Sequence, residues 1–369
     1  MISSVHLKNF KPFANQFLSF KPLTLLSGLN STGKSSVLQA LLLMRQSYQQ
    51  GLLENQGLAL NGDLVCIGTA QDALFEGAKD DFISFKIVWR NDKQGIWNFS
   101  CDREKDVLNL ASPPVTSDIY KLSLFNQKFH YLQAERLGPR LFSQMSDFQV
   151  QKLQQFGAKG EYTAHFLFIN ENQTIPNRSL GHPQEESLIL REQVEAWMGE
   201  ISPGTRLKIN PKQDIDLISL QYSYGDSNPY RSTNVGFGIS YTLPIIVAVL
   251  SSPPGSLILI ENPEAHLHPK GQAKMGELLA LAASCGVQIV VETHSDHVLN
   301  GIRLTVYRGK LDPEKVQLHY FDRRKQGTEF ITEVISPQID RNGRIDKWPE
   351  GFFDEWDNSL EALLEPREE

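Results

Sequence analysis

Apolar and polar positions alternate near the start of the chain in a way that predicts β structure. Two short alternating runs over residues 2–20 indicate a β-ribbon, and further alternation follows over residues 57–101. Between them, an unbroken apolar run at 22–27 leads into a glycine-bearing loop and a leucine-rich helix over 35–50. The first hundred residues therefore predict strands around one strand–loop–helix unit.

A second ordered region follows residue 234. Its pattern predicts an apolar helix over 239–251, a buried strand over 256–260, an amphipathic helix over 270–284 and another buried strand over 287–291. Two such units close in sequence indicate parallel strands with crossover helices. We therefore expect an α/β fold in which one sheet is assembled from both ends of the chain.

The middle of the chain lacks this regularity. Over residues 116–233, Gln and Asn are frequent, turn residues recur, and a helix is expected near 186–199. We expect a mainly helical insertion that separates the two halves of one core, 1–115 and 234–335. A distinct tail would then cover 336–369.

Composition and charge are typical of a soluble globular protein. Hydrophobic residues make up 40% and charged residues 21%, and the net charge of −7 argues against a general coating of nucleic acid. The cysteines Cys66, Cys101 and Cys285 are far apart and indicate a reducing compartment. The longest apolar run, near 243–250, is shorter than the roughly 20 residues of a membrane span. With no signal peptide visible, we expect a cytoplasmic protein.

The loop Gly28–Ser35 matches the pattern G-x-x-x-x-G-K-[ST]. Its glycines let successive backbone N–H groups point at phosphate oxygens, and the following helix adds the positive end of its dipole. Lys34 would reach the β- and γ-phosphates, and Ser35 would supply an oxygen to Mg²⁺. We expect ATP and Mg²⁺ as ligands. The predicted nucleotide-binding residues of this loop are Asn30, Ser31, Thr32, Gly33, Lys34, Ser35 and Ser36.

The strand over 257–261 ends in carboxylates, as Leu-Ile-Leu-Ile-Glu is followed by Asn-Pro-Glu. Glu261 is the metal-side acid by register. The amide of Asn262 can orient a water molecule but cannot take its proton. Glu264 is then the candidate base. The alternative is that Glu264 only caps the following turn.

Histidines cluster beside the same strand ends. His294 ends the next buried strand, where it can contact a γ-phosphate and respond to its presence. A transition-metal site is the alternative, because four imidazoles lie near two adjacent strand ends. These are His266, His268, His294 and His297.

Glycines also precede the apolar helix, in Gly236-Phe237-Gly238-Ile239-Ser240. Glycines at a helix start, followed by serine, form a second anion-binding end. Gly236, Gly238 and Ser240 therefore join the predicted nucleotide-binding residues. An ordinary glycine-rich turn is the alternative.

In this order, with Asn9-Phe10 before them, the motifs resemble those of RecF/SMC-type ABC ATPases. Within that group the chain is similar to stand-alone bacterial AAA-family ATPases related to OLD (overcoming-lysogenization-defect) proteins. The segments 135–140 and 348–355 resemble a subfamily whose C-terminal part has no assigned function. The resemblance implies a P-loop NTPase head of the ABC type, with a mixed sheet, flanking helices and an N-terminal antiparallel β part.

The resemblance also implies roles and assembly. By match, Lys34 and Ser35 take the Walker A roles, Glu261 the Walker B role, Ser240 the signature role and His294 the switch role. In such ATPases, the signature segment of one protomer touches the γ-phosphate bound by another. We therefore expect a homodimer or a larger even-numbered homo-oligomer.

Two positions depart from the general ABC pattern. Asn262 stands where a glutamate is usual, which predicts slow hydrolysis without affecting binding. No Q-loop is clear, and Gln71 is the candidate for that metal-side position.

We expect an ATPase switch that acts on a separate effector protein, such as a nuclease, or on nucleic acid, in phage defence or DNA maintenance. One alternative is a metal-dependent nuclease regulated by ATP. No acidic cluster of the OLD nuclease kind follows His294. Another alternative is an ATP-binding scaffold with little hydrolysis.

Two features near the C-terminus leave alternatives open. A basic run could bind DNA or form a solvated face; it comprises Arg303, Arg308, Lys310, Lys315, Arg323, Arg324 and Lys325. Apolar residues at helical spacing could dock onto the core or form a partner surface; they are Phe352, Phe353, Trp356, Leu360, Leu363 and Leu364.

Overall fold

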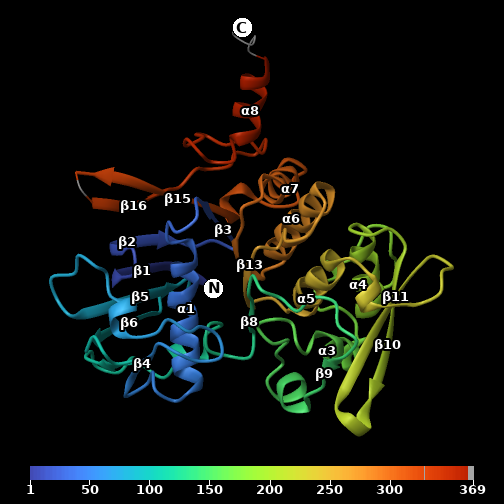
Figure 1. Cartoon of the computed structure of the whole chain (residues 1–369), viewed down its shortest axis with the longest axis horizontal. Coiled ribbons are helices and arrows are strands. Elements are labelled where there is room, and N and C mark those ends of the chain that lie inside the picture. Colours follow the sequence, from blue (N-terminus) through green and yellow to red (C-terminus); the bar gives the residue numbers. More distant parts are fainter. Residues whose placement is uncertain (328, 365–369) are drawn as a thin grey trace.

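A computed structural model describes residues 1–327 and 329–364 (Figure 1). Its N-terminal part is a six-stranded antiparallel sheet with the order β2-β1-β5-β6-β7-β4. The strands are β1 (Ile2–Phe10), β2 (Phe13–Ser19), β4 (Gly57–Ala59), β5 (Phe82–Trp89), β6 (Gln94–Ser100) and β7 (Val107–Leu110). The predicted ribbon is β1 paired with β2. Every second residue of β5 is buried, so one face of the sheet packs on the core.

The second sheet has the order β16-β15-β3-β14-β13-β8. Its strands are β3 (Leu23–Gly28), β8 (Phe129–Leu132), β13 (Leu257–Glu261), β14 (Gln288–Glu292), β15 (Val316–Gln326) and β16 (Glu329–Ile335). Pairing is parallel from β8 to β15, and β16 pairs with β15 antiparallel. Strand β3 lies between β14 and β15, so the predicted sheet built from both ends of the chain is confirmed.

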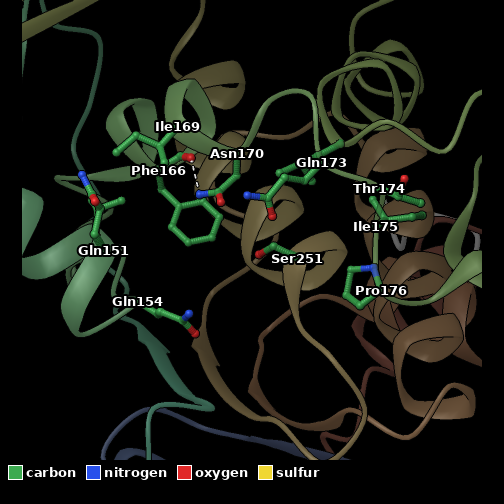
Figure 2. A pocket seen from close by; sticks show the side chains of 12 residues that line it. Gln151, Gln154, Phe166, Ile169, Asn170, Gln173, Thr174, Ile175, Pro176 and Ser251 are labelled. Carbon is green, nitrogen blue, oxygen red and sulfur yellow. Dashed lines mark hydrogen bonds between the residues drawn. The ribbon is translucent and has the colours of Figure 1, made fainter.

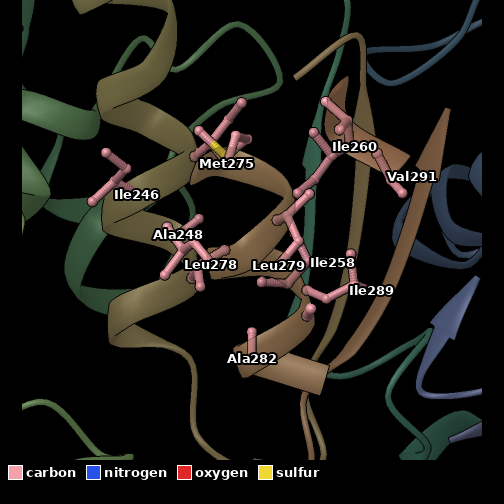
Figure 3. Close-up of a cluster of buried hydrophobic side chains, with 14 of the residues drawn as sticks. Ile246, Ala248, Ile258, Ile260, Met275, Leu278, Leu279, Ala282, Ile289 and Val291 are labelled. Carbon is pink, nitrogen blue, oxygen red and sulfur yellow. The ribbon is translucent and has the colours of Figure 1, made fainter. Parts of the chain in front are cut away.

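Four main helices accompany this sheet. They are α1 (Lys34–Gln49), α5 (Phe237–Ser251), α6 (Pro269–Ser284) and α7 (Asp296–Tyr307); a single turn, α2 (Ala70–Ala73), lies nearer the N-terminal sheet. Side chains of α5 and α6, such as Ile246 and Leu278, pack with Ile258 and Ile289 of the strands (Figure 3). Each fully buried side chain of this kind contributes about 1.5–3 kcal/mol, so this layer fixes the strand ends that carry the acidic residues.

The expectation of a mainly helical segment over 116–233 needs correction. The segment does contain α3 (Thr163–Asn170) and α4 (Leu190–Gly199), but β8 belongs to the central sheet. A further sheet is formed by β9 (Ser143–Gln144), β10 (Thr205–Lys212), β11 (Leu217–Tyr224) and β12 (Tyr230–Arg231). The alternation in β10 and β11 is weak because only two side chains of each strand are buried, so the sequence pattern did not predict the hairpin.

Short turns complete the connections. Single 3₁₀ turns cover Ile119–Lys121, Arg178–Leu180, Gln213–Ile215, Ser232–Asn234 and Pro313–Lys315, and a π-helical turn covers Phe148–Lys152. Helix α8 (Glu355–Leu364) projects from the body at the end of the described chain (Figure 1). Among the residues that the structure describes, no helix is long and apolar enough to cross a membrane.

Candidate nucleotide site

The loop between β3 and α1 adopts a conformation that depends on its two glycines. Gly28 has a φ of 137°, and a Cβ there would lie 2.1 Å from the carbonyl oxygen of Phe321. Gly33 has a φ of 106° and caps α1, and a Cβ there would lie 2.7 Å from the ring of Pro12. Both positions therefore exclude any other residue. The predicted strand, loop and helix are all present around them.

The ammonium group of Lys34 lies inside the curve of this loop. Its Nζ donates to the carbonyl oxygens of Gly28 (3.0 Å) and Leu29 (2.6 Å). Burial lowers the pKa of Lys34, and the nearby Glu292 carboxylate opposes that shift. A phosphate group with its own negative charge would offer this cation a stronger partner than two carbonyls.

A hollow of about 440 Å³ opens beside Lys34. Its lining includes Lys11, Pro12, Ser31, Gly33, Ser35, Ser36, Gln39, Asp72, Leu74 and Glu76. Gln71, the candidate Q-loop residue, is exposed and is not part of this lining, whereas the neighbouring Asp72 is. The structure therefore does not bring Gln71 to the loop, and a polar residue beside an Asp was too weak a signal to place it.

The acid nearest to the predicted metal-binding serine is Glu292, at the end of β14. The hydroxyl of Ser35 donates to Glu292 Oε1 at 2.8 Å. The second oxygen, Oε2, is buried and has no hydrogen-bond partner among the described residues. The pKa of Glu292 is raised to about 7, mainly by burial. The negative charges of Glu261 and Glu264 also raise this pKa, whereas the Ser35 hydrogen bond and the Lys34 charge lower it.

Glu261, the acid predicted by register, instead faces β8. Its two oxygens accept hydrogen bonds from the Tyr131 hydroxyl (2.9 Å) and the Ala134 N–H (3.1 Å). Glu261 and Glu292 are paired residues of neighbouring strands, so both carboxylates end at the same sheet edge. Burial, then Glu261, raises the pKa of Tyr131, which keeps its hydroxyl a donor. The sequence predicted the right edge but could not orient the side chains on it.

Arg136 connects the two sides of this edge. The side chain is buried and donates to the carbonyl oxygens of Glu261 (2.6 Å), Asn262 (2.6 Å) and Tyr241 (3.0 Å). It lies in the segment 135–140, to which the sequence patterns assigned no role. A buried cation with several carbonyl acceptors fixes the backbone after β13 relative to α5.

Asn262 and Glu264 are both engaged in backbone structure. Asn262 has a φ of 44°, a left-handed conformation that asparagine tolerates better than glutamate. The two oxygens of Glu264 accept hydrogen bonds from the Thr293 hydroxyl (2.7 Å) and the His294 N–H (2.8 Å). In this arrangement Glu264 links the segment after β13 to the turn after β14, which is neither the free base nor the cap of its own following turn that the sequence suggested.

His294 is exposed at the mouth of a second hollow, of about 330 Å³. Ser27, Gly28, Leu29 and Asn30 form one wall, and Tyr320 with residues 351–355 forms the other. Burial lowers the pKa of His294, and the nearby Lys34 lowers it further. A neutral imidazole beside the start of the phosphate loop can accept or donate a hydrogen bond.

The other histidines do not form a metal centre. His266 packs against the rings of Phe237 and Tyr241, and the His268 ring accepts a hydrogen bond from the Lys270 N–H at the start of α6. Within the described parts of the chain, no group of three or more His, Cys, Asp or Glu residues could hold a metal ion. The geometry gives the four-imidazole alternative no support.

The glycine-rich start of α5 presents its backbone, and Ser240 points elsewhere. Gly236 is the N-cap, and Gly236 and Phe237 are exposed. Ser240 lies one turn further on, where it is half-buried and lines a small hollow with the buried Tyr222 and Leu243. The first N–H groups of the helix are therefore the available anion donors, and the Ser240 hydroxyl is not among the groups that face outward.

The C-terminal segment contacts the phosphate loop directly. The Thr332 hydroxyl on β16 donates to the Thr32 carbonyl at 3.0 Å. Phe352 is fully buried against Tyr320, whose hydroxyl donates to the Glu350 carbonyl at 2.9 Å. Trp356, Leu360, Leu363 and Leu364 instead form an exposed apolar face of α8. The apolar C-terminal residues thus divide between core docking and a free surface.

The predicted basic run is largely engaged within the chain. Arg308 and Lys310 both pair with Glu277 at 3.6 Å, and Arg324 pairs with Asp322 at 3.2 Å. Arg303 donates to the Gly343 carbonyl at 2.8 Å. These contacts favour the solvated-face alternative over a continuous DNA-binding surface.

A third hollow, of about 310 Å³, lies in the middle segment (Figure 2). Amides and apolar groups line it, among them Gln151, Gln154, Phe166, Asn170 and Ser251. The lining contains no titratable side chain, so the hollow has no evident chemistry.

Three family models match successive parts of the chain. Residues 1–112 match "AAA ATPase domain", residues 129–300 match "AAA domain, putative AbiEii toxin, Type IV TA system", and residues 311–363 match a "Protein of unknown function (DUF3696)". The matched segments contain the phosphate loop, the acidic strand ends and the C-terminal contact, in that order. No curated protein matches the chain.

Solved structures show the same fold. A structure of an Smc head bound to the C-terminal winged-helix domain of ScpA has a TM-score of 0.55 at 14% identity, covering 91% of this chain and 98% of its own. A Pyrococcus furiosus structure, an Smc head with an extended coiled coil bound to the C-terminal domain of ScpA, has a TM-score of 0.55 at 12% identity, covering 99% of both chains. The predicted ABC-type head, with its N-terminal antiparallel sheet, is confirmed.

Proposed function

We propose that this chain, an ABC-type ATPase head with AAA-family segments, binds and hydrolyses ATP with Mg²⁺ and acts as a switch for a partner. The observation that carries the proposal is the meeting of Lys34, Ser35 and Glu292 at a loop that requires both Gly28 and Gly33. Backbone N–H groups, a cation and a hydroxyl–carboxylate pair are the groups that a magnesium nucleotide needs. The buried, unpartnered oxygen of Glu292 fits a missing cation there.

Hydrolysis is proposed to be slow. Asn262 cannot accept a proton, and both oxygens of Glu264 are engaged by Thr293 and His294. A base would become available only if Glu264 exchanged one of these bonds for a water molecule. Slow turnover suits a switch, because the ATP-bound state then persists long enough to be recognised.

Head-to-head dimerisation is supported by the position of the start of α5, which does not line the nucleotide site of its own protomer. The start of α5 is exposed and has no contact with the phosphate loop of its own chain in the hollow beside Lys34. In a sandwich of two heads, its N–H groups would complete the site of the second protomer. A homodimer, or a larger even-numbered assembly, is the proposed active form.

The partner is proposed to be a separate effector protein. Thr332 contacts the phosphate loop, residues 351–355 face the loop across a hollow, and the exposed apolar face of α8 follows in the same segment. The two similar Smc heads were solved with ScpA, so heads of this fold do dock other proteins. A nuclease effector in phage defence, or DNA in a maintenance system, is the proposed context.

The test compares wild type with Lys34→Ala and with Lys270→Ala, an exposed lysine on α6. Fluorescent ATP binding, phosphate release and light-scattering mass are measured for each. We expect wild type and Lys270→Ala to bind ATP, turn over slowly and form dimers, and Lys34→Ala to lose all three. Binding or turnover that persists in Lys34→Ala would contradict the proposal.

A scaffold with little hydrolysis is the second candidate, favoured by Asn262 and by the engaged Glu264. ATP-dependent dimers with no phosphate release in wild type would support it. DNA binding is tested by measuring DNA affinity at several salt concentrations, because contacts to DNA phosphates weaken steeply as the salt concentration rises. A salt-independent interaction would exclude such contacts.

A further inference from the structure

We infer that Glu292 is the protein carboxylate that binds Mg²⁺ together with Ser35, and that Glu261 acts behind it as a positioning acid. The inference deepens the proposed function and rests on it, since the metal would arrive with the nucleotide. It assigns a ligand that neither the motif order nor the register predicted.

The first support is the distance between the two oxygens. Ser35 Oγ and Glu292 Oε1 lie 2.8 Å apart. Mg²⁺ binds oxygen at about 2.0–2.1 Å in octahedral geometry, which places neighbouring ligands about 3 Å apart. The two side chains are therefore already spaced as adjacent ligands of one ion.

The second support is the unpartnered oxygen. Glu292 is 5% exposed, and its Oε2 is buried without a hydrogen-bond partner among the described residues. A buried carboxylate oxygen without a partner loses its hydration with no compensating hydrogen bond. A cation at this position, or water bound to it, would restore that interaction.

The third support is what the other acids at the edge already do. Tyr131 and Ala134 engage both oxygens of Glu261. Thr293 and His294 engage both oxygens of Glu264. Of the three carboxylates, only Glu292 combines contact with the Walker serine and a free oxygen.

The backbone keeps Glu292 in place. The N–H of Asn262 donates to the Glu292 carbonyl at 2.8 Å, and the Thr293 N–H donates to the Leu26 carbonyl at 3.1 Å. Glu292 is also in register with Leu26 of β3 and Glu261 of β13. The side chain therefore starts from a residue anchored on both sides, which is the rigidity that a metal ligand needs.

The test measures metal binding separately from catalysis. Fluorescent ATP affinity is measured with Mg²⁺ and with EDTA, and Mn²⁺ bound in the ATP complex is followed by electron paramagnetic resonance. The variants are Glu292→Gln, which can still accept a hydrogen bond from Ser35, and Glu261→Gln as the matched acid. Thermal unfolding without ligand checks that each variant is folded.

We expect Glu292→Gln to bind ATP in EDTA with the affinity of wild type. The increase in ATP affinity that Mg²⁺ produces should be at least tenfold smaller in this variant than in wild type, and the spectrum of bound Mn²⁺ should change. Glu261→Gln should keep most of that gain. A wild-type metal response in Glu292→Gln, with loss in Glu261→Gln, would overturn the inference. If wild type itself fails to bind ATP, the proposed function fails instead. In that case the ATP signal of Lys34→Ala would equal that of wild type both with Mg²⁺ and with EDTA.

Discussion

The guanidinium of Arg136 holds the carbonyl oxygen of Asn262 at 2.6 Å, from a segment more than a hundred residues earlier in the chain. The same side chain also binds the carbonyls of Glu261 and Tyr241. One buried residue thus sets the backbone between the acidic strand and the helix α5. With the Gln133 carbonyl it serves four acceptors, and its removal would leave Asn262 with only the Ala265 N–H as a donor.

Arg136→Ala should therefore be strongly destabilising. Hydrogen bonds from a charged donor are worth about 1.5–3 kcal/mol each, so losing several of them should destabilise the fold and loosen the turn at Asn262. Urea unfolding measures the loss. Arg140→Ala, an exposed arginine four residues later, is the control and should stay within about 0.5 kcal/mol of wild type. Equal stability of the two variants would disprove this role.

Gly28→Ala should prevent the phosphate loop from forming. The new Cβ would lie 2.1 Å from the Phe321 carbonyl, at a φ of 137°. Strand β15 would have to separate from β3, so we expect loss of ATP binding and several kcal/mol of stability. At Gly199, a Cβ meets no atom within 4 Å. Gly199→Ala should behave like wild type in thermal unfolding and in ATP titration, and matching defects in both variants would be the contrary result.

Thr332→Val should weaken nucleotide binding from outside the motif. The variant removes the donor to the Thr32 carbonyl while preserving shape, and one such hydrogen bond is worth about 0.5–1.5 kcal/mol. We expect ATP affinity to fall about two- to tenfold in a fluorescence titration. Thr332→Ser retains the hydroxyl and should restore affinity. An unchanged affinity in Thr332→Val would show that the C-terminal segment does not influence the loop.

Acid should destabilise the protein through His130 on β8. Burial, assisted by the nearby Arg45, lowers its pKa to about 3, so the folded protein keeps the ring neutral. Below the unfolded pKa of about 6.5 the unfolded chain takes up a proton that the folded state refuses. Stability should then fall by up to about 1.4 kcal/mol per pH unit between pH 6.5 and pH 3. Urea unfolding of His130→Phe should show a smaller fall, and an identical pH profile would exclude the mechanism.

The core and the phosphate loop could be predicted because their signals are local. An apolar run, two glycines and a helix lie within residues 22–50, and the strands near 257–261 and 288–292 are short, apolar and bounded by turn residues. Their parallel pairing follows from the crossover helices between them. These features depend on neighbours in sequence and therefore appear in it.

The orientation of the site residues could not be predicted in the same way. Glu261 and Glu292 both end a strand at the same edge, and only the packing of β8 decides that Tyr131 engages one of them. Ser240 follows the glycines as a signature serine would, but it faces a small hollow that it shares with the buried Tyr222. Both outcomes depend on partners from the middle segment, whose weak alternation concealed its strands.

Strand β3 has neighbours that are synthesised long after it. It pairs with β14 and β15, which follow it by more than two thirds of the chain. Translation at roughly 5–20 residues per second leaves the nascent phosphate loop without either flanking strand for most of synthesis. The nucleotide site can therefore assemble only after β15 has been synthesised. A ribosome-bound fragment that lacks β15 should expose the apolar edge of β3 and depend on chaperones until release.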